Sequence, residues 1–121
     1  MLNDYEKAYY AVAWLGIEAQ NGGLNQFFFN STGGMVPEVR MGLRMMGAER
    51  TLSILERAMR LFGRQELPRD DLERREIVLS LAEEAEESLD ELTDEFFDVV
   101  DELHEQHTSF ATRNRQRFGA A

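Results

Sequence analysis

Apolar residues recur at steps of three and four along most of the chain, which is the spacing of an amphipathic helix. The first segment, 4–20, is almost wholly apolar over residues 8–17, so we expect a central helix with most of its circumference buried. Asn21-Gly22-Gly23 ends it, since Asn and Gly accept the left-handed conformation of a helix C-cap. A short helix over 24–30, with three consecutive phenylalanines, follows.

The pattern predicts four further helices after a turn at residues 31–34. Pro37 suits the first turn of a helix that ends at Gly47, and the next helix covers residues 49–62 and ends at Gly63.

Two acidic helices complete the expected set. Asp70 or Asp71 can cap a fifth helix, and Thr93 can cap a sixth. The inner side of the fifth would carry Leu72, Val78, Leu81, Ala82, Ala85, Leu89 and Leu92. That of the sixth would carry Phe96, Val100, Leu103, His107 and Phe110. No segment alternates at period two, so we predict an all-α, compact single-domain bundle of about six helices over residues 1–121, with no sheet.

Composition narrows the class of protein. Hydrophobic residues make up 43% and aromatic residues 10% of the chain, which favours a folded domain over intrinsic disorder. There is no cysteine, so disulfides and thiolate chemistry are excluded. The apolar run 8–17 is about half the length of a membrane span, and Asp4 and Glu6 before it disfavour a signal peptide. We therefore expect a cytoplasmic protein without a membrane partner.

Charge is the most informative property of the sequence. The net charge is −10, which disfavours direct binding to nucleic acid or anionic lipid. The acid is concentrated in a helical block, residues 70–107, where Glu76 to Glu105 includes 13 carboxylates and no Lys or Arg. A short basic tail, residues 113–117, follows.

Helical spacing places part of this acid on a single face. Opposite the apolar stripe, Asp94, Asp98, Asp101 and Glu105 follow at steps of four, three and four, and Glu83, Glu87 and Asp90 lie close to one line on the preceding helix. At a rise of about 1.5 Å per residue, the block carries roughly one charge per 3.5 Å, against about 3.4 Å along one DNA strand. Two such helices side by side would approach the charge density of duplex DNA.

A solvated helix face is the alternative interpretation of the same pattern, because acidic faces often serve solubility alone. Such a face usually mixes signs, since Glu and Lys four residues apart stabilise a helix and like charges destabilise it. The absence of Lys and Arg from 76–105 therefore favours a bound partner.

Other chemistry is poorly represented. Asp101 and His104 have the spacing of half a di-metal carboxylate–histidine motif, but the second half is missing, so we predict no metal site and no cofactor. No nucleophile or zinc motif occurs, and the acidic residues lie on an expected exposed face. We therefore predict that the protein is not an enzyme.

The most unusual string runs from Asn21 to Asn30. We expect Gly22 and Gly23 to form a tight turn and Phe27 and Phe28 to enter the core. Asn21, Gln26 and Asn30 are expected to bond turn backbone that would otherwise be buried unpaired. The alternative is a pocket whose amides bind a ligand.

With Glu18 and Gly33, this string resembles the signature of a helical domain-of-unknown-function family of small bacterial proteins that includes a DNA-mimic protein. The likeness continues through Gly47-Ala48, Phe62-Gly63 and 89–97, and departs at Leu24, where Phe is expected. It implies an all-helical fold and makes DNA mimicry a specific proposal.

The leading hypothesis is a DNA mimic that presents the acidic face to a basic DNA-binding protein. The residues expected to bind this partner are Glu83, Glu87, Asp90, Asp94, Asp98, Asp101 and Glu105. One alternative is a small-ligand or metal-binding protein that uses the Asn21–Asn30 turn or His104. A second is a subunit of an assembly whose acidic face is only solubilising. Pairing of the arginine tail with the acidic face of another copy would give a homodimer.

Overall fold

The computed structural model describes residues 1–119, and within them the chain is helical and forms no strand. The helices are α1 (Asp4–Phe29), η1 (Ser31–Met35), α2 (Val36–Met45), α3 (Glu49–Phe62), α4 (Asp71–Leu79), α5 (Glu83–Arg113) and η2 (Arg115–Arg117), where η marks a 3-10 helix. This confirms the predicted all-α class. None of the helices in residues 1–119 combines the length and apolar character needed to cross a bilayer.

Helix α1 contains the predicted break. Gly22 (φ −147°, ψ 20°) and Gly23 (φ 79°, ψ 176°) depart from helical geometry, so α1 is two helical parts joined at a kink. The positive φ of Gly23 is one that residues with a side chain rarely adopt. The Asn-Gly-Gly sequence therefore interrupts the helix as expected, and the second part carries the phenylalanines.

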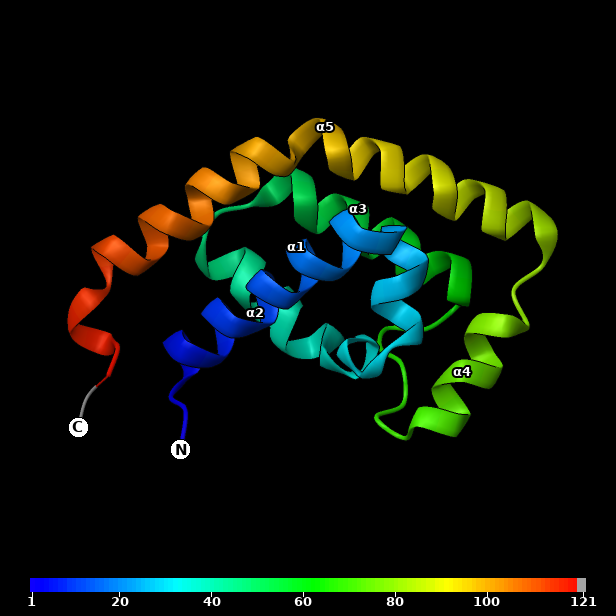
Figure 1. Cartoon of the computed structure of the whole chain (residues 1–121), viewed down its shortest axis with the longest axis horizontal. Helices are drawn as coiled ribbons and strands as arrows, with labels where there is room; N and C mark the ends of the chain where they lie inside the picture. The colour runs from blue at the N-terminus through cyan, green and yellow to red at the C-terminus, as the bar shows by residue number, and fades with distance from the viewer. Residues whose placement is uncertain (120–121) are drawn as a thin grey trace.

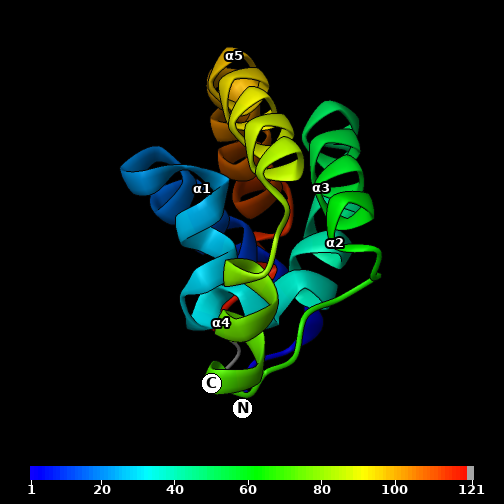
Figure 2. The ribbon, with the colours of Figure 1, turned by 90° about the vertical axis from the view of Figure 1, so that its right-hand side faces the viewer.

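The bundle is assembled around α1, which contacts α2, α4, α5 and η1. Figure 1 shows α5 arching across one side of the molecule, and Figure 2 shows α1 and α3 on either side of it. The core includes Leu15, Phe27, Phe28, Leu55 and Phe96, each no more than 2% exposed.

One side of α1 remains open. Tyr10, Trp14 and Ile17 are 51%, 43% and 54% exposed. Seven of the ten residues 8–17 are buried or half-buried, so most of the helix circumference is covered as expected and one face is exposed. The physical reason is that these three side chains share the helix face opposite Ala8, Val12 and Leu15, which the packed helices cover.

The acidic block is divided differently from the prediction. The break falls between Leu79 and Glu83, and α5 then runs without interruption for 31 residues. Asp70 caps α4 as expected, accepting a bond of 2.9 Å from the Glu73 backbone N–H. Thr93 caps no helix. It lies inside α5, where its Oγ1 donates to Leu89 O and accepts from the Leu24 backbone N–H, each at 3.1 Å.

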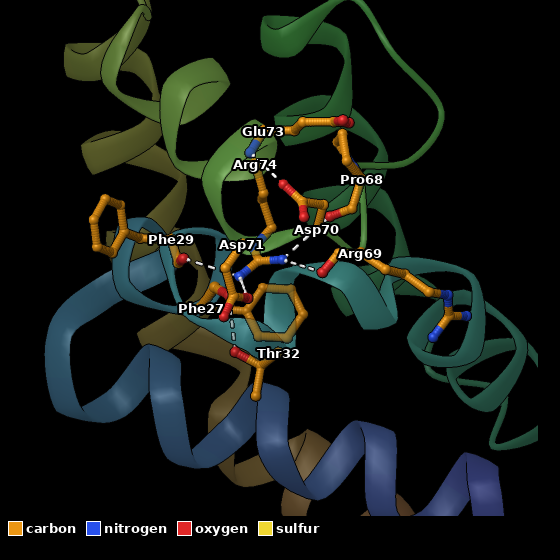
Figure 3. Close-up of polar contacts among 9 residues, drawn as sticks. All are labelled: Phe27, Phe29, Thr32, Pro68, Arg69, Asp70, Asp71, Glu73 and Arg74. Carbon is orange, nitrogen blue, oxygen red and sulfur yellow. Dashed lines mark hydrogen bonds and ion pairs between the residues drawn. The ribbon is translucent and has the colours of Figure 1, made fainter.

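Helix α4 is held by a buried arginine in addition to its apolar side chain Val78. Arg74 is 0% exposed, and it donates to the carbonyl oxygens of Pro68 (3.2 Å), Arg69 (3.1 Å) and Phe29 (3.4 Å) and to Asp71 Oδ1 (2.6 Å). Figure 3 shows its guanidinium among these acceptors. These bonds attach α4 to the end of α1.

Two residues expected on the inner side of the fifth helix are in fact exposed. Leu72 is 72% exposed, and Ala82 lies in the exposed link before α5. The buried residues of α4 are Arg74 and Val78. Leu72 points outward because the short helix docks through those two side chains.

Candidate functional site

Residues on the outer face of α5 form an acidic row, which is the candidate partner-binding surface. Its members are the seven residues singled out from the sequence, Glu83, Glu87, Asp90, Asp94, Asp98, Asp101 and Glu105, and all are exposed. Successive members are three or four residues apart, the spacing of one helix face. The buried side chains of α5, such as Leu92, Phe96 and Leu103, lie opposite. The structure therefore places the row on one continuous helix, where two had been expected.

Two other carboxylates of α5 turn away from the row toward α3. Arg57 binds Glu95 through two hydrogen bonds, Nη2 to Oε1 at 2.8 Å and Nη1 to Oε2 at 3.0 Å. Arg50 Nη1 lies 2.9 Å from Glu102 Oε2. Hydrogen bonding to Arg57 lowers the pKa of Glu95, and the same bond raises the pKa of Arg57. These pairs join α3 to α5 and remove two of the twelve α5 carboxylates from the unpaired set.

The remaining ten α5 carboxylates have no ion-pair partner among residues 1–119. The stretch from Glu83 to Glu105 covers about 33 Å at roughly 1.5 Å per residue, so the nine intervals between these ten charges average about 3.7 Å. One DNA strand has one charge per about 3.4 Å, and the duplex one per about 1.7 Å. The expected duplex density, which required two helices side by side, is not reached because the carboxylates follow a single helix axis.

The Asn-Gly-Gly turn is stabilised by a carboxylate that sequence reasoning left without a role. Glu18 Oε2 accepts from Gln26 Nε2 at 2.7 Å and from Asn30 Nδ2 at 3.0 Å. Gln26 and Asn30 were expected to bond turn backbone, and that expectation is wrong. Through these two hydrogen bonds, Glu18 links the two halves of α1 across the kink. The only sequence signal for this role of Glu18 was its position three residues before Asn21, about one helical turn ahead of the break.

The other signature residues divide between core and surface. Phe27 and Phe28 are fully buried, with ring centroids 5.2 Å apart, whereas Asn21 is exposed. The backbone N–H of Leu24, just after the kink, is satisfied by Thr93. The string therefore builds the junction of α1 with α5.

A hollow of about 410 Å³ lies beside this turn, between α1, α4 and α5. Its walls include Asn25, Gln26 and Asn30 together with apolar groups such as Phe29 and Leu81. The Asn25 Oδ1 atom is buried and has no hydrogen-bond partner within the described chain. The hollow is a candidate ligand site because amide side chains stand beside apolar groups in its walls.

The two histidines of α5 line another hollow, of about 300 Å³, between α1 and α5. His107 Nε2 lies 2.9 Å from Tyr9 O, and the two rings stack with centroids 4.1 Å apart, so His107 packs α5 against α1. His104 is exposed, three residues after Asp101. Within residues 1–119, no group of three or more His, Cys, Asp or Glu side chains is arranged to hold a metal ion, so the metal alternative gains no structural support.

The basic tail also has a structural partner. The Arg117 guanidinium lies over the Tyr5 ring, 5.0 Å from its centroid, and Arg117 O accepts from Asn3 Nδ2 at 2.6 Å. Arg113 and Arg115 are exposed. Arg117 therefore packs against the start of α1.

Fold and surface together define an all-helical acidic protein whose longest helix displays a row of exposed carboxylates. The chain belongs to the DMP19-like protein family, whose family model matches residues 1–114. This confirms the resemblance found in the sequence at the level of the family. Comparisons with curated proteins and with solved structures gave no match.

Proposed function

We propose that the protein is a non-enzymatic DNA mimic, which binds the basic surface of a DNA-binding protein through the acidic row of α5. The observation that carries the proposal is the row itself: seven exposed carboxylates on one helix face, unpaired within residues 1–119. Phosphate contacts supply much of the affinity of DNA-binding proteins. A rigid line of carboxylates can engage the same Lys and Arg side chains.

The distribution of arginines favours this proposal over a solubilising face. Arg50 and Arg57 neutralise carboxylates on the α3 flank of α5, but the row itself receives no cation within the described chain. Like charges at steps of three and four destabilise a helix. Contact with a cationic partner would offset that cost. The family resemblance adds support, because the family that the sequence resembles includes a DNA mimic.

The test is capture followed by competition. The immobilised protein is incubated with a lysate of the organism that encodes it, at about 50 and about 500 mM salt, between which electrostatic binding weakens steeply. Captured proteins are then bound to labelled DNA and titrated with the free protein. We expect a captured DNA-binding protein to release its DNA. Capture of no DNA-binding protein at low salt, or capture without release of DNA, would contradict the proposal.

A charge-matched pair of variants separates the row from net charge. Reversal of Glu87, Asp94 and Asp101 to Lys should weaken DNA release at least about tenfold, while the new Glu–Lys pairs preserve helicity. The control reverses Glu66, Glu73 and Glu76, which are exposed but lie outside α5. Equal losses in both variants would mean that the partner senses net charge alone.

The hollow beside Asn25 supports a second candidate function, the binding of a small ligand that has an N–H or O–H donor. The supporting observation is the partly apolar hollow, whose walls include the amide residues Asn25, Gln26 and Asn30. A thermal-shift screen of amino acids and nucleosides tests it, since a ligand of the folded state raises Tm. A Tm increase that is lost in Asn25→Leu would favour this function, and no increase with any compound would count against it.

A further inference from the structure

A second charged surface, of the opposite sign, lies where α2 meets the end of α3. Four arginines, Arg40, Arg44, Arg60 and Arg64, line a hollow of about 440 Å³ together with Glu56 and Gln65. Glu56 is the one carboxylate in this lining, so the walls carry a formal charge of +3. Such a concentration of positive charge is unexpected in a chain of net charge −10.

Arg40 forms a fixed wall of this hollow. Its Nε and Nη2 donate to Glu56 Oε1 at 3.0 and 2.8 Å, and Nη2 also donates to Gln65 O at 2.7 Å. Its side chain is only 16% exposed. These bonds join α2, α3 and the segment after α3, and they pair Glu56 with Arg40.

The other three guanidiniums are not used internally. Arg44, Arg60 and Arg64 are exposed, and within residues 1–119 none of their side chains forms an ion pair or a hydrogen bond to protein. The Arg64 backbone is nevertheless fixed, because its N–H donates to Met59 O at 3.2 Å beyond the left-handed Gly63. Their hydrogen-bond donors are therefore available at one place and positioned by ordered backbone.

The spacing of these arginines has an electrostatic cost. Arg40 and Arg44 are four residues apart on α2. Arg60 lies in the last turn of α3, Arg64 follows the left-handed Gly63, and both line the same hollow. Like charges four apart on a helix repel, and so do cations gathered around one hollow. An anion in the hollow would relieve the repulsion of both pairs at once.

From these contacts we infer that the hollow binds a small polyanion that contains a pyrophosphate group. A guanidinium fork pairs with phosphate oxygens through two parallel hydrogen bonds, and three unused forks require a ligand with several charged oxygens. A charge of +3 matches a pyrophosphate group better than a single phosphate. The volume falls within the range of about 300–1,000 Å³ that small-molecule sites occupy.

This site is separate from the acidic row. Arg50, Ser53 and Arg57 face α5 from one flank of α3, whereas Glu56 and Arg60 face α2 from another. Figure 2 shows α5 beside α3 and α2 below it. The inference therefore does not depend on DNA mimicry, and failure of either proposal leaves the other standing.

Isothermal titration calorimetry at constant ionic strength provides the test, with sodium pyrophosphate and a nucleoside diphosphate as probes and sulfate and citrate as comparison anions. Constant ionic strength is essential, because added salt screens the repulsion along α5 without any binding. We expect one site for pyrophosphate, with sulfate and citrate at least tenfold weaker. If the nucleoside diphosphate binds more tightly than pyrophosphate, the natural ligand is a nucleotide. If the two bind equally, the ligand is the inorganic anion. No heat from either probe, or equal affinity for citrate, would overturn the inference.

Arg44→Gln/Arg64→Gln is the decisive variant, because neither side chain supports the fold through a bond within residues 1–119. Its dissociation constant for pyrophosphate should rise at least tenfold. Arg113→Gln/Arg115→Gln makes the same change in charge at exposed residues elsewhere and should bind like the parent protein. Parent-like affinity in the first variant, or equal losses in both, would refute the site. Circular dichroism verifies folding, and Arg60→Gln replaces the double variant if that one unfolds.

Discussion

Replacement of Arg74 tests the most specific claim about how the fold is held together. Its guanidinium is fully buried and donates to three carbonyl oxygens and one carboxylate. A hydrogen bond to a charged group contributes about 1.5–3 kcal/mol, but the four are not additive, and burial of the cation offsets part of the gain. We therefore expect Arg74→Met, which keeps most of the side-chain volume, to lower the free energy of unfolding by about 3–5 kcal/mol.

Urea denaturation measures this change. For a slope of about 1–3 kcal/mol per M, the midpoint should fall by roughly 2 M. Arg74→Lys should recover only part of the loss, because a single ammonium group cannot reach four acceptors. Arg75→Met is the neighbouring control. Arg75 is exposed and lies 5.1 Å from the centroid of the Phe29 ring, a contact of about 0.5–1 kcal/mol. A loss below about 1 kcal/mol in Arg74→Met would refute the assigned role.

Three further predictions concern packing and pH. Thr93→Val should cost about 1–3 kcal/mol in urea denaturation, because it leaves the Leu24 backbone N–H buried without its acceptor; an unchanged midpoint would contradict this. Gly42→Ala should lower Tm despite the better helix propensity of Ala, since the new Cβ would lie 2.7 and 2.9 Å from α1 atoms, and a higher Tm would show that α1 and α2 can separate at little cost. The Arg57 contact lowers the pKa of Glu95 from 4.5, so its stabilisation is complete above about pH 4.5 and is lost at lower pH. Glu95→Gln should therefore flatten the acid limb of the stability profile, and a profile parallel to the parent would argue against it.

Local signals in the sequence were sufficient for much of the fold. The bounds 49–62 coincide with α3, because Gly63 adopts the left-handed conformation that ends a helix. Asp70 caps α4, and Gly22 and Gly23 break α1. Each of these features depends on residues within one turn of the position concerned.

The errors came from contacts between residues distant in the sequence. Thr93 resembles a helix cap because its hydroxyl can accept an N–H bond, and it does accept one, but from Leu24 of another helix. Arg74 resembles a surface residue within Glu-Arg-Arg-Glu. It is buried against the end of α1, and one of its four acceptors is the carbonyl of Phe29, 45 residues earlier. Hydrophobic periodicity does not identify such distant partners.

The candidate site likewise has a part that the sequence predicts and a part that depends on distant contacts. Periodicity indicated an exposed face, and the structure places all seven members of the acidic row on it. It could not indicate that Glu95 and Glu102 pair with α3. The arginine hollow was missed because its members come from two helices and a loop whose association requires the fold.

The single-helix arrangement of the row leads to a prediction about salt. DNA binding weakens steeply with salt because the partner releases ions condensed on the dense duplex charge. The ten unpaired carboxylates lie about 3.7 Å apart along the axis, roughly half the duplex density, so they hold fewer such ions. The affinity of a shared partner for this protein should therefore decline less with salt than its affinity for DNA. Competition at about 50 and about 200 mM salt measures both declines. If the affinity for the protein declines as steeply as the affinity for DNA, or more steeply, then α5 does not imitate DNA through a single line of carboxylates.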